Sequence, residues 1–234
     1  MNRQTVVTVA ARKGGVGKTA TATALASVLA AAGRSVLLVD LDTQGSAAEA
    51  LGVEALESGA AAWLEGKEAS FLEPLEGLRL LAGGPDLETV LRLDRVDLSR
   101  LLGRDPAEVV IFDTAPGAGV LSRAAVAVAD VVLAVTEPHP LGLAGAVSIL
   151  QGLTEDQRRA VILSRLDLRK ALHRTISEGI GENLPGVEIL PVRADALFER
   201  ALAEGRPLSA GRACNALEDL EAVAAWAFPR KGKK

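Results

Sequence analysis

The sequence of 234 residues contains a single cysteine, Cys214, and no tyrosine. One cysteine cannot build a disulfide framework, a cysteine-based metal site or an iron–sulfur cluster that needs paired cysteines. We therefore expect Cys214 to be a small apolar residue near the last helix. No uninterrupted apolar run approaches the roughly 20 residues that a membrane-spanning helix needs. Because the first apolar strand follows the start within a few residues, no signal peptide fits, and we expect a cytoplasmic protein.

The composition is that of a globular, slightly acidic protein. Hydrophobic residues make up 49% of the chain and the formal net charge is −4. This composition and length suit one domain with a full core. A globally acidic chain is not a general binder of polyanions, so any contact with nucleic acid must come from a local basic patch. We expect the domain to span residues 1–228 and residues 229–234 to form a short basic tail.

Continuous apolar runs alternate with helical patterns along the chain. Such strands indicate a mostly parallel, twisted sheet covered by helices on both faces, joined by right-handed crossovers, in a single α/β domain. The expected strands are 5–11, 35–40, 78–82, 109–114, 131–136, 160–165 and 187–192. The expected helices are 20–32, 46–51, 60–64, 87–93, 98–102, 141–150, 168–180, 194–203 and 215–228.

A glycine-rich loop, residues 12–19, joins the first strand to the first helix and reads R-K-G-G-V-G-K-T. Strand, glycine loop, Lys-Thr and helix is the context of a phosphate-binding loop, so the fold is expected to be that of a P-loop NTPase. Glycines let backbone N–H groups approach phosphate oxygens, and the helix start adds further donors and a positive dipole end. Lys18 would bind the β- and γ-phosphates, and the Thr19 hydroxyl would ligate Mg²⁺.

The strict pattern G-x-x-x-x-G-K-[ST] fails here, because Arg12 occupies the position of the first glycine. The variant K-G-G-x-G-K-T resembles the deviant Walker A motif of the ParA/MinD family of ATPases. The resemblance extends over nearly the whole chain, whose small size resembles plasmid-type ParA proteins. It implies that Lys13 reaches across a dimer interface to the partner's nucleotide. The expected nucleotide-binding residues of the loop are Lys13, Gly14, Gly15, Val16, Gly17, Lys18, Thr19 and Ala20.

Acidic residues end two of the expected strands, where α/β sheets place their ligands. The segment 40–45, D-L-D-T-Q-G, resembles the family's D-x-D-P-Q-G first switch, and 113–117, D-T-A-P-G, resembles its second switch. The resemblance implies that Asp42 orients the attacking water, that Asp40 supports the Mg²⁺ shell and that Asp113 is the Walker B carboxylate. The first two aspartates can equally cap the helix that follows. Expected catalytic residues are therefore Lys13, Lys18 and Asp42, and expected metal ligands are Thr19, Asp40 and Asp113.

The resemblance also implies contacts to the adenine base and to DNA in the later part of the chain. Loops after the last two strands flank the base in the family, which makes Arg165, Pro191 and Val192 the candidates. This part of the chain is the most basic, although its arginines are interspersed with acidic residues as on an ordinary surface. Candidate contacts to DNA phosphates are Arg169, Lys170, Arg174, Arg193 and Arg200.

Three further residues are expected to be structural. Trp63 and Phe71 are large aromatic side chains that we expect to anchor the core. His139 lies between two prolines with no nucleophile evident beside it, so we expect it to shape a turn.

Several activities within the family are excluded by what the chain lacks. Without tyrosine it is no autophosphorylating tyrosine kinase, and with one cysteine it is no metal-cluster carrier. The last helix carries Glu218, Asp219 and Glu221, which anionic lipid would repel, so no stable membrane binding is expected.

What remains is a nucleoid-associated partition ATPase that segregates plasmid or chromosome DNA. The resemblance implies an ATP-bound homodimer, non-specific DNA binding, and slow hydrolysis of ATP to ADP stimulated by a ParB-type centromere- or cargo-binding protein. One alternative is a ParA-like ATPase that positions a protein cargo. A MinD-like membrane-associated spatial regulator is another. A nucleotide-gated adaptor with negligible hydrolysis is the alternative from another class.

Overall fold

The computed structural model describes residues 4–55, 59–181, 184–207 and 214–229. Eight strands form one sheet in the order β3-β4-β2-β5-β1-β6-β7-β8, and all neighbouring pairs are parallel except β3 and β4. The strands are β1 (Thr5–Ala10), β2 (Val36–Leu41), β3 (Leu72–Leu75), β4 (Leu78–Leu81), β5 (Val109–Thr114), β6 (Val131–Thr136), β7 (Arg158–Leu166) and β8 (Glu188–Arg193).

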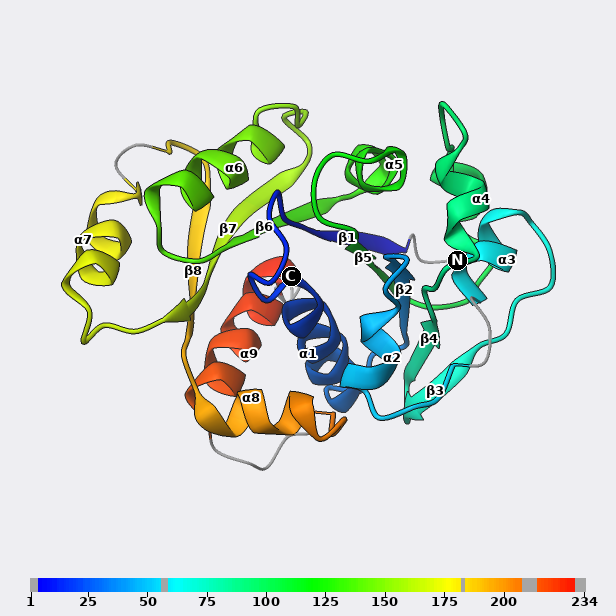
Figure 1. Cartoon of the computed structure of the whole chain (residues 1–234), viewed down its shortest axis with the longest axis horizontal. Coiled ribbons are helices and arrows are strands. Elements are labelled where there is room, and N and C mark those ends of the chain that lie inside the picture. Colours follow the sequence, from blue (N-terminus) through cyan, green and yellow to red (C-terminus); the bar gives the residue numbers. More distant parts are fainter. Residues whose placement is uncertain (1–3, 56–58, 182–183, 208–213, 230–234) are drawn as a thin grey trace, which may run out of the picture.

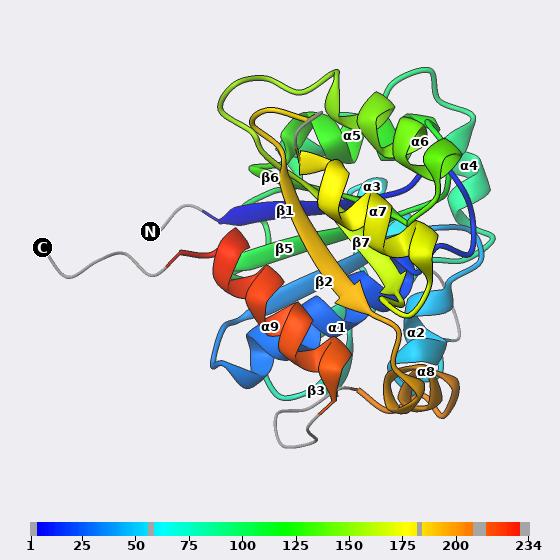
Figure 2. The ribbon, with the colours of Figure 1, turned by 90° about the vertical axis from the view of Figure 1, so that its left-hand side faces the viewer.

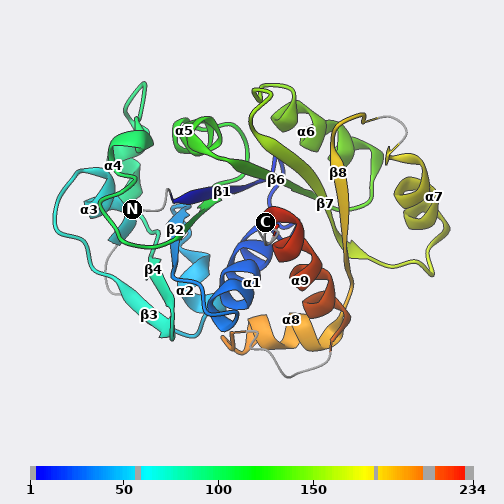
Figure 3. The ribbon, with the colours of Figure 1, turned by 180° about the vertical axis from the view of Figure 1, so that it is seen from behind.

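Helices cover both faces of this sheet (Figures 1 and 3). Helices α1, α2, α8 and α9 lie on one face, α3, α4, α5 and α6 lie on the other, and α7 lies at the β8 edge. Their bounds are α1 (Lys18–Ala31), α2 (Ser46–Ala50), α3 (Gly59–Leu64), α4 (Leu87–Leu91), α5 (Val120–Val128), α6 (Pro140–Leu150), α7 (Ala171–Gly179), α8 (Ala196–Ala203), α9 (Asn215–Ala227) and the 3₁₀ turn η1 (Leu98–Arg100). The α/β fold predicted from the sequence is confirmed.

The central strands are apolar on both sides because each side packs against helices. In β5, Val109 and Ile111 contribute to the core under α1 and α9, while Val110 and Phe112 contribute to the core under α5 and α6. Successive side chains of a strand point to opposite faces, so a strand buried on both faces reads as an unbroken apolar run. Figure 2 shows α9 beside α1 along the first of these faces.

The structure differs from the sequence-based expectations in the middle of the chain. Strand β3 pairs antiparallel with β4 at the edge of the sheet, and helix α5 follows β5; neither element was expected. The helix expected at 98–102 is a single 3₁₀ turn. Trp63 is buried as predicted, but Phe71 is 39% exposed, with the Arg79 guanidinium 5.2 Å from its ring centroid. That expectation was wrong because Phe71 directly precedes an edge strand, which has a neighbour on one side.

Other local expectations can be compared directly with the structure. His139 caps α6, since its Nδ1 accepts a hydrogen bond from the Leu141 N–H, and Cys214 is a buried residue at the start of α9. Of the expected basic tail, 229–234, only Pro229 belongs to the described residues. In the described part of the chain, no helix is both long and apolar enough to cross a membrane.

The parallel strands bring the candidate site residues to one edge of the sheet. The loop at 12–17 follows β1, and the acidic segment at 40–45 begins with the last two residues of β2 and continues beyond it. In the register of the sheet Asp113 lies beside Val9 on one side and beside Asp40 on the other. Residues that are about 100 positions apart in a parallel α/β sheet thus share one carboxyl edge, as the topological rule requires.

Candidate functional site

The glycine loop between β1 and α1 has the backbone that a phosphate-binding loop needs (Figure 1). Gly15 and Gly17 have φ angles of 77° and 89°, in the left-handed region that favours glycine. Gly17 immediately precedes α1, so the loop leads directly into the free N–H groups of the helix start. Lys13 is exposed, and its side chain has no ion pair or hydrogen bond with any residue that the structure describes.

Lys18 and Asp113 form a buried ion pair at the centre of the site. The Lys18 Nζ atom lies 2.7 Å from Asp113 Oδ1, with side-chain exposures of 8% and 0%. The same Nζ lies 3.4 Å from the hydroxyl of Thr19. Asp113 Oδ2 is buried and has no hydrogen-bond partner among the described residues. A buried carboxylate oxygen without a partner is costly, so the site holds unused capacity for a cation or a donor.

Asp40 lies next to this pair and organises the segment that follows β2. Its Oδ1 accepts the Asp42 N–H at 2.9 Å, and its Oδ2 accepts the Ala47 N–H at 3.1 Å. Burial, reinforced by the nearby charge of Asp113, raises the pKa of Asp40 to about 7. Burial also raises the pKa of Asp113, against the opposing effect of Lys18. Two buried carboxylates, Asp40 and Asp113, thus lie near a single cation, Lys18. A further positive charge would therefore be stabilised at this site.

These residues fit a magnesium ion that is shared with a nucleotide. In the described ranges, no group of three or more His, Cys, Asp or Glu is arranged to hold a metal by itself. Magnesium in nucleotide sites is characteristically bound by one or two protein oxygens, with phosphates and waters completing its shell. The free Oδ2 of Asp113 and the nearby Thr19 hydroxyl supply that donor set. Asp40 already accepts two backbone N–H groups, which suits a supporting role.

The candidate first switch segment, residues 40–45, is held against a glycine pair that sequence reasoning missed. A Cβ on Gly83 would lie 2.3 Å from the Asp42 carbonyl oxygen and 2.9 Å from Asp40 Cγ. Gly83 lies shortly after the end of β4, and without a Cβ its backbone approaches the acidic segment more closely than any side chain allows. The available signal was the Gly-Gly pair at the end of a strand. Asp42 is partly exposed, and its Oδ1 accepts the Gln44 N–H at 3.0 Å.

The candidate second switch segment, residues 113–117, contacts β1 and the glycine loop. The Thr114 hydroxyl donates to the Val9 carbonyl at 3.1 Å, and the Gly117 N–H donates to the Ala11 carbonyl at 2.9 Å. A Cβ on Gly14 would lie 3.9 Å from Pro116 Cγ, so the loop and this segment are in van der Waals proximity. The candidate second switch therefore contacts both β1 and the loop that follows it.

The structure places one of the three base-contact candidates at the glycine loop and the other two in strand β8. Arg165 lies at the glycine loop, where its Nη1 donates to the Gly15 carbonyl at 2.8 Å and pairs with Glu137 at 2.9 Å. Pro191 and Val192 belong to β8, and Pro191 lies beside Leu163 in the sheet. Val192 is 4% exposed, so its side chain belongs to the core.

Most of the DNA-contact candidates already have acidic or carbonyl partners. Arg193 reaches both carboxylate oxygens of Asp219 at 2.8 Å and also contacts helix α9 at Asn215 and Glu218. Arg169 pairs with Asp167, Arg200 pairs with Glu204, and Arg174 donates to the Leu168 carbonyl. Arg169, Lys170 and Arg174 are exposed together at the start of α7.

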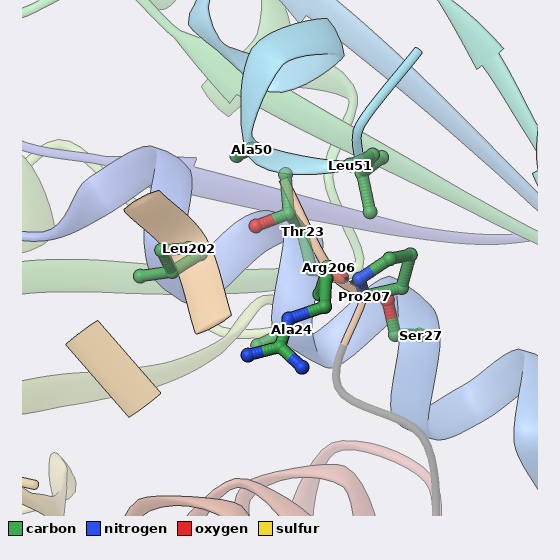
Figure 4. Close-up of a pocket in the computed structure, with 8 residues that line it drawn as sticks. All are labelled: Thr23, Ala24, Ser27, Ala50, Leu51, Leu202, Arg206 and Pro207. Atoms are coloured by element: carbon green, nitrogen blue, oxygen red, sulfur yellow. Dashed lines mark hydrogen bonds between the residues drawn. The ribbon is translucent and has the colours of Figure 1, made fainter. Parts of the chain in front are cut away.

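A small recess lies away from the glycine loop, between α1, α2 and the segment after α8 (Figure 4). Its lining residues come from the middle of α1, the end of α2 and the region 202–207, and they include none of the candidate site residues. They are Thr23, Ala24, Ser27, Ala50, Leu51, Leu202, Arg206 and Pro207.

Comparisons with known proteins agree with this geometry. Residues 7–208 match the family described as "CobQ/CobB/MinD/ParA nucleotide binding domain". The chromosome-partitioning ATPase Soj of Thermus thermophilus is 39% identical over 153 residues, which are 64% of this chain and 61% of that protein. The match therefore spans less than two thirds of that relative. The maintenance of carboxysome distribution protein A of Gloeobacter kilaueensis is 34% identical over 223 residues, covering 91% of this chain and 88% of that protein.

The solved structures show the same fold. A putative plasmid partition protein from Borrelia burgdorferi, bound to AMPPNP, has a TM-score of 0.78 at 19% identity, covering 98% of this chain and 100% of that one. The sheet, the glycine loop and the buried carboxylates are thus arranged on a framework found in nucleotide-binding proteins. The chain belongs to the CobQ/CobB/MinD/ParA family of nucleotide-binding domains.

Proposed function

We propose that the chain is a partition ATPase that dimerises with ATP, binds DNA non-specifically in that state and hydrolyses ATP slowly to segregate plasmid or chromosome DNA. The observation that carries the proposal is the contrast between the two lysines of the loop. Lys18 is buried against Asp113, whereas Lys13 is exposed and has no partner among the described residues. A site complete within one subunit has no use for a second lysine at its rim.

Nucleotide binding requires Lys18 to move its charge from Asp113 to the phosphates, which the loop N–H groups also bind. Thr19 and Asp113 would hold Mg²⁺ with the phosphates, supported by Asp40, and the ion would neutralise phosphate charge. Lys13 would meet the nucleotide of a second copy and close the dimer. Asp42 would orient the attacking water, so that hydrolysis opens the dimer again.

DNA binding is the second half of the proposed cycle. Arg169, Lys170 and Arg174 at the start of α7, with Arg193 and Arg200, would contact phosphates across the closed dimer. A surface assembled from two copies would make DNA binding depend on ATP. A ParB-type centromere- or cargo-binding protein would accelerate hydrolysis, and the dimer would be nucleoid-associated in the cytoplasm.

The test is a DNA-binding assay of the whole chain with ATP, with ADP and without nucleotide, over a salt series. We expect a shift of non-specific duplex DNA only with ATP, weakening steeply as salt rises, because each phosphate contact releases a counterion. Changing Lys170 and Arg174 to Ala should flatten that salt dependence, while Arg100→Ala in η1 should not. Equal DNA affinity with ATP, with ADP and without nucleotide would contradict the proposal.

Positioning of a protein cargo by the same cycle is a second candidate. It is favoured by the 34% identity to a carboxysome-distribution protein over 91% of this chain. The MinD-like alternative predicts liposome co-sedimentation without DNA binding. Measured ATP turnover, with and without a partner, separates all of these from a nucleotide-gated adaptor that hydrolyses negligibly.

A further inference from the structure

Strand β7 is irregular where it reaches the site. Its register with β8 shifts between Leu163 and Leu166, and Arg165 has a φ angle of 51°. Within the described ranges, Arg165 is the only residue other than glycine with a positive φ. This conformation is unfavourable for an L-residue, and such outliers concentrate at ligand sites. Irregularities of this kind re-aim side chains at a strand end.

The irregularity lets two consecutive side chains reach the same loop. The buried Ser164 hydroxyl donates to the Val16 carbonyl at 2.6 Å. The Arg165 Nη1 donates to the neighbouring Gly15 carbonyl at 2.8 Å. In a regular strand, adjacent side chains would point to opposite faces of the sheet and could not share a target. Two successive carbonyls of the phosphate-binding loop are thus fixed by the end of β7.

Fixing these carbonyls also fixes the N–H groups on the other side of each peptide. In a trans peptide the C=O of one residue and the N–H of the next point in opposite directions. The Gly15 and Val16 carbonyls point to β7, so the N–H groups of Val16 and Gly17 point away from it. In the sheet, β5 and β2, which carry Asp113 and Asp40, lie on the opposite side of β1 from β7. The donors are therefore directed to the carboxylate side of the loop.

We propose that Ser164 and Arg165 form a clasp that holds the loop peptides in the orientation that binds a polyphosphate. They are positioning residues for the phosphates, and Arg165 is no contact for the base. The proposal rests on the nucleotide binding described above and adds the residues that pre-organise it. A loop whose peptides are already oriented loses less freedom when the anion binds, which strengthens binding.

Two glutamates keep the Arg165 guanidinium in place. Glu137, in the loop between β6 and α6, lies 2.9 Å from Nη1, and Glu199 in α8 lies 3.8 Å from Nε. All three side chains are about half exposed, so the ion pairs add little stability by themselves. Their effect is to orient the guanidinium, which holds the Gly15 carbonyl.

The test compares ATP with inorganic tripolyphosphate, a ligand that has phosphates but no base. Arg165→Gly removes the side chain but suits the positive φ, so the thermal midpoint should stay at the wild-type value. We expect both ligands to bind about tenfold more weakly to Arg165→Gly and about fivefold more weakly to Ser164→Ala, as for the loss of one hydrogen bond. Arg165→Lys keeps one donor and should recover part of the loss.

Arg159→Ala is the matched control, because Arg159 lies at the opposite end of the same strand and bonds the Thr154 carbonyl. It should bind both ligands like the wild type. A loss confined to ATP would show a base contact and overturn the clasp, as would unchanged affinity for both ligands in all three variants. In either case the ATPase proposal stands. Only a wild-type chain that binds neither ligand would overturn both.

Discussion

The Nζ atom of Lys18 lies 2.7 Å from Oδ1 of Asp113, and both side chains are buried. Without nucleotide the lysine therefore neutralises the carboxylate that would support the metal. A nucleotide that takes the lysine leaves Asp113 buried and unpaired, in need of a new cation. The geometry would thus couple phosphate binding to metal binding through a single exchange of partners.

Replacing Asp113 with Asn should uncouple metal binding from phosphate binding. Lys18 would lose its buried partner, so the nucleotide-free chain should lose about 3 kcal/mol of stability, which is typical of a broken buried pair. ADP should restore much of that loss, because its phosphates pair with Lys18. Calorimetric titration should show ADP affinity that no longer rises when Mg²⁺ is added. If Mg²⁺ raised the ADP affinity of Asp113→Asn as much as it raises that of the wild type, the proposed exchange of Lys18 between Asp113 and the phosphates would be contradicted.

Lys13→Ala tests the shared site. The side chain has no described partner in its own subunit, so ATP should still bind. Dimerisation with ATP should be lost, because the charge between two nucleotides is no longer neutralised. Light scattering with a slowly hydrolysed ATP analogue measures the mass, and Lys67→Ala, a surface lysine paired with Glu65, is the control. A dimer of normal stability would rule out the bridging role.

Asp42→Ala tests the assignment of the water-positioning residue. Loss of such a group typically lowers the rate by about a hundredfold or more. We expect ATP to bind and the ATP dimer to persist, while phosphate release slows. The exposed Asp156 provides a control aspartate outside the site. Hydrolysis at the wild-type rate would leave Asp42 without this role.

Gly83→Ala should distort the first switch without touching the nucleotide loop. The added Cβ would overlap the Asp42 carbonyl at 2.3 Å, and that contact is with backbone that has to shift. We expect a loss of about 1–3 kcal/mol in unfolding free energy and a lower hydrolysis rate. Gly152→Ala adds a Cβ with no atom within 4 Å and should be neutral. Equal unfolding free energies and hydrolysis rates in Gly83→Ala and Gly152→Ala would contradict the close approach of Gly83 to the Asp42 carbonyl.

The raised pKa of Asp40 gives the nucleotide-free chain a pH-dependent stability. Folding raises this pKa from 3.8 to about 7, so between these values the folded chain keeps a proton that the unfolded chain has released. Stability from this group is therefore fully present below pH 3.8 and is lost as pH rises through about 7. The slope approaches about 1.4 kcal/mol per pH unit.

Urea unfolding with a chelator, for wild type and Asp40→Asn, isolates this contribution. The wild-type curve should fall more steeply from pH 5 to pH 7, at about the limiting slope of one proton, and the two curves should run parallel above pH 8. Parallel curves across the whole range would mean that Asp40 is ionised in the folded chain throughout.

The sequence predicts those parts of the fold that are buried on both faces. Strands such as β5 and β6 are continuous apolar runs, and their polar carboxyl ends mark the site. By contrast, β3 is half-buried at an edge and contains Pro74, so its pattern resembles a loop. Helix α5 was missed because it is rich in valine and alanine and follows a glycine-rich turn. The exposure of Phe71 also depends on that unpredicted edge.

The candidate site was predictable where its residues are contiguous in sequence. The loop at 12–19 and the two acidic segments are short motifs with a fixed order, so Lys18 and Asp113 could be assigned to one site from the sequence, although their direct ion pair was not expected. The contacts of Ser164 and Arg165 with the loop join residues 148 and 150 positions apart. They also depend on one backbone angle and a register shift, for which the sequence carries no local pattern.

Strand β8, at the opposite edge of the described sheet from β3, places a proline at Pro191, beside Leu163 of β7. Proline has no N–H group, so one donor is missing from the row that a further strand would need. Addition of a second copy in line with the sheet is therefore discouraged at this edge. At this edge, two copies that associate would meet through loops and side chains, and such contacts would open again when the ligand between them changes.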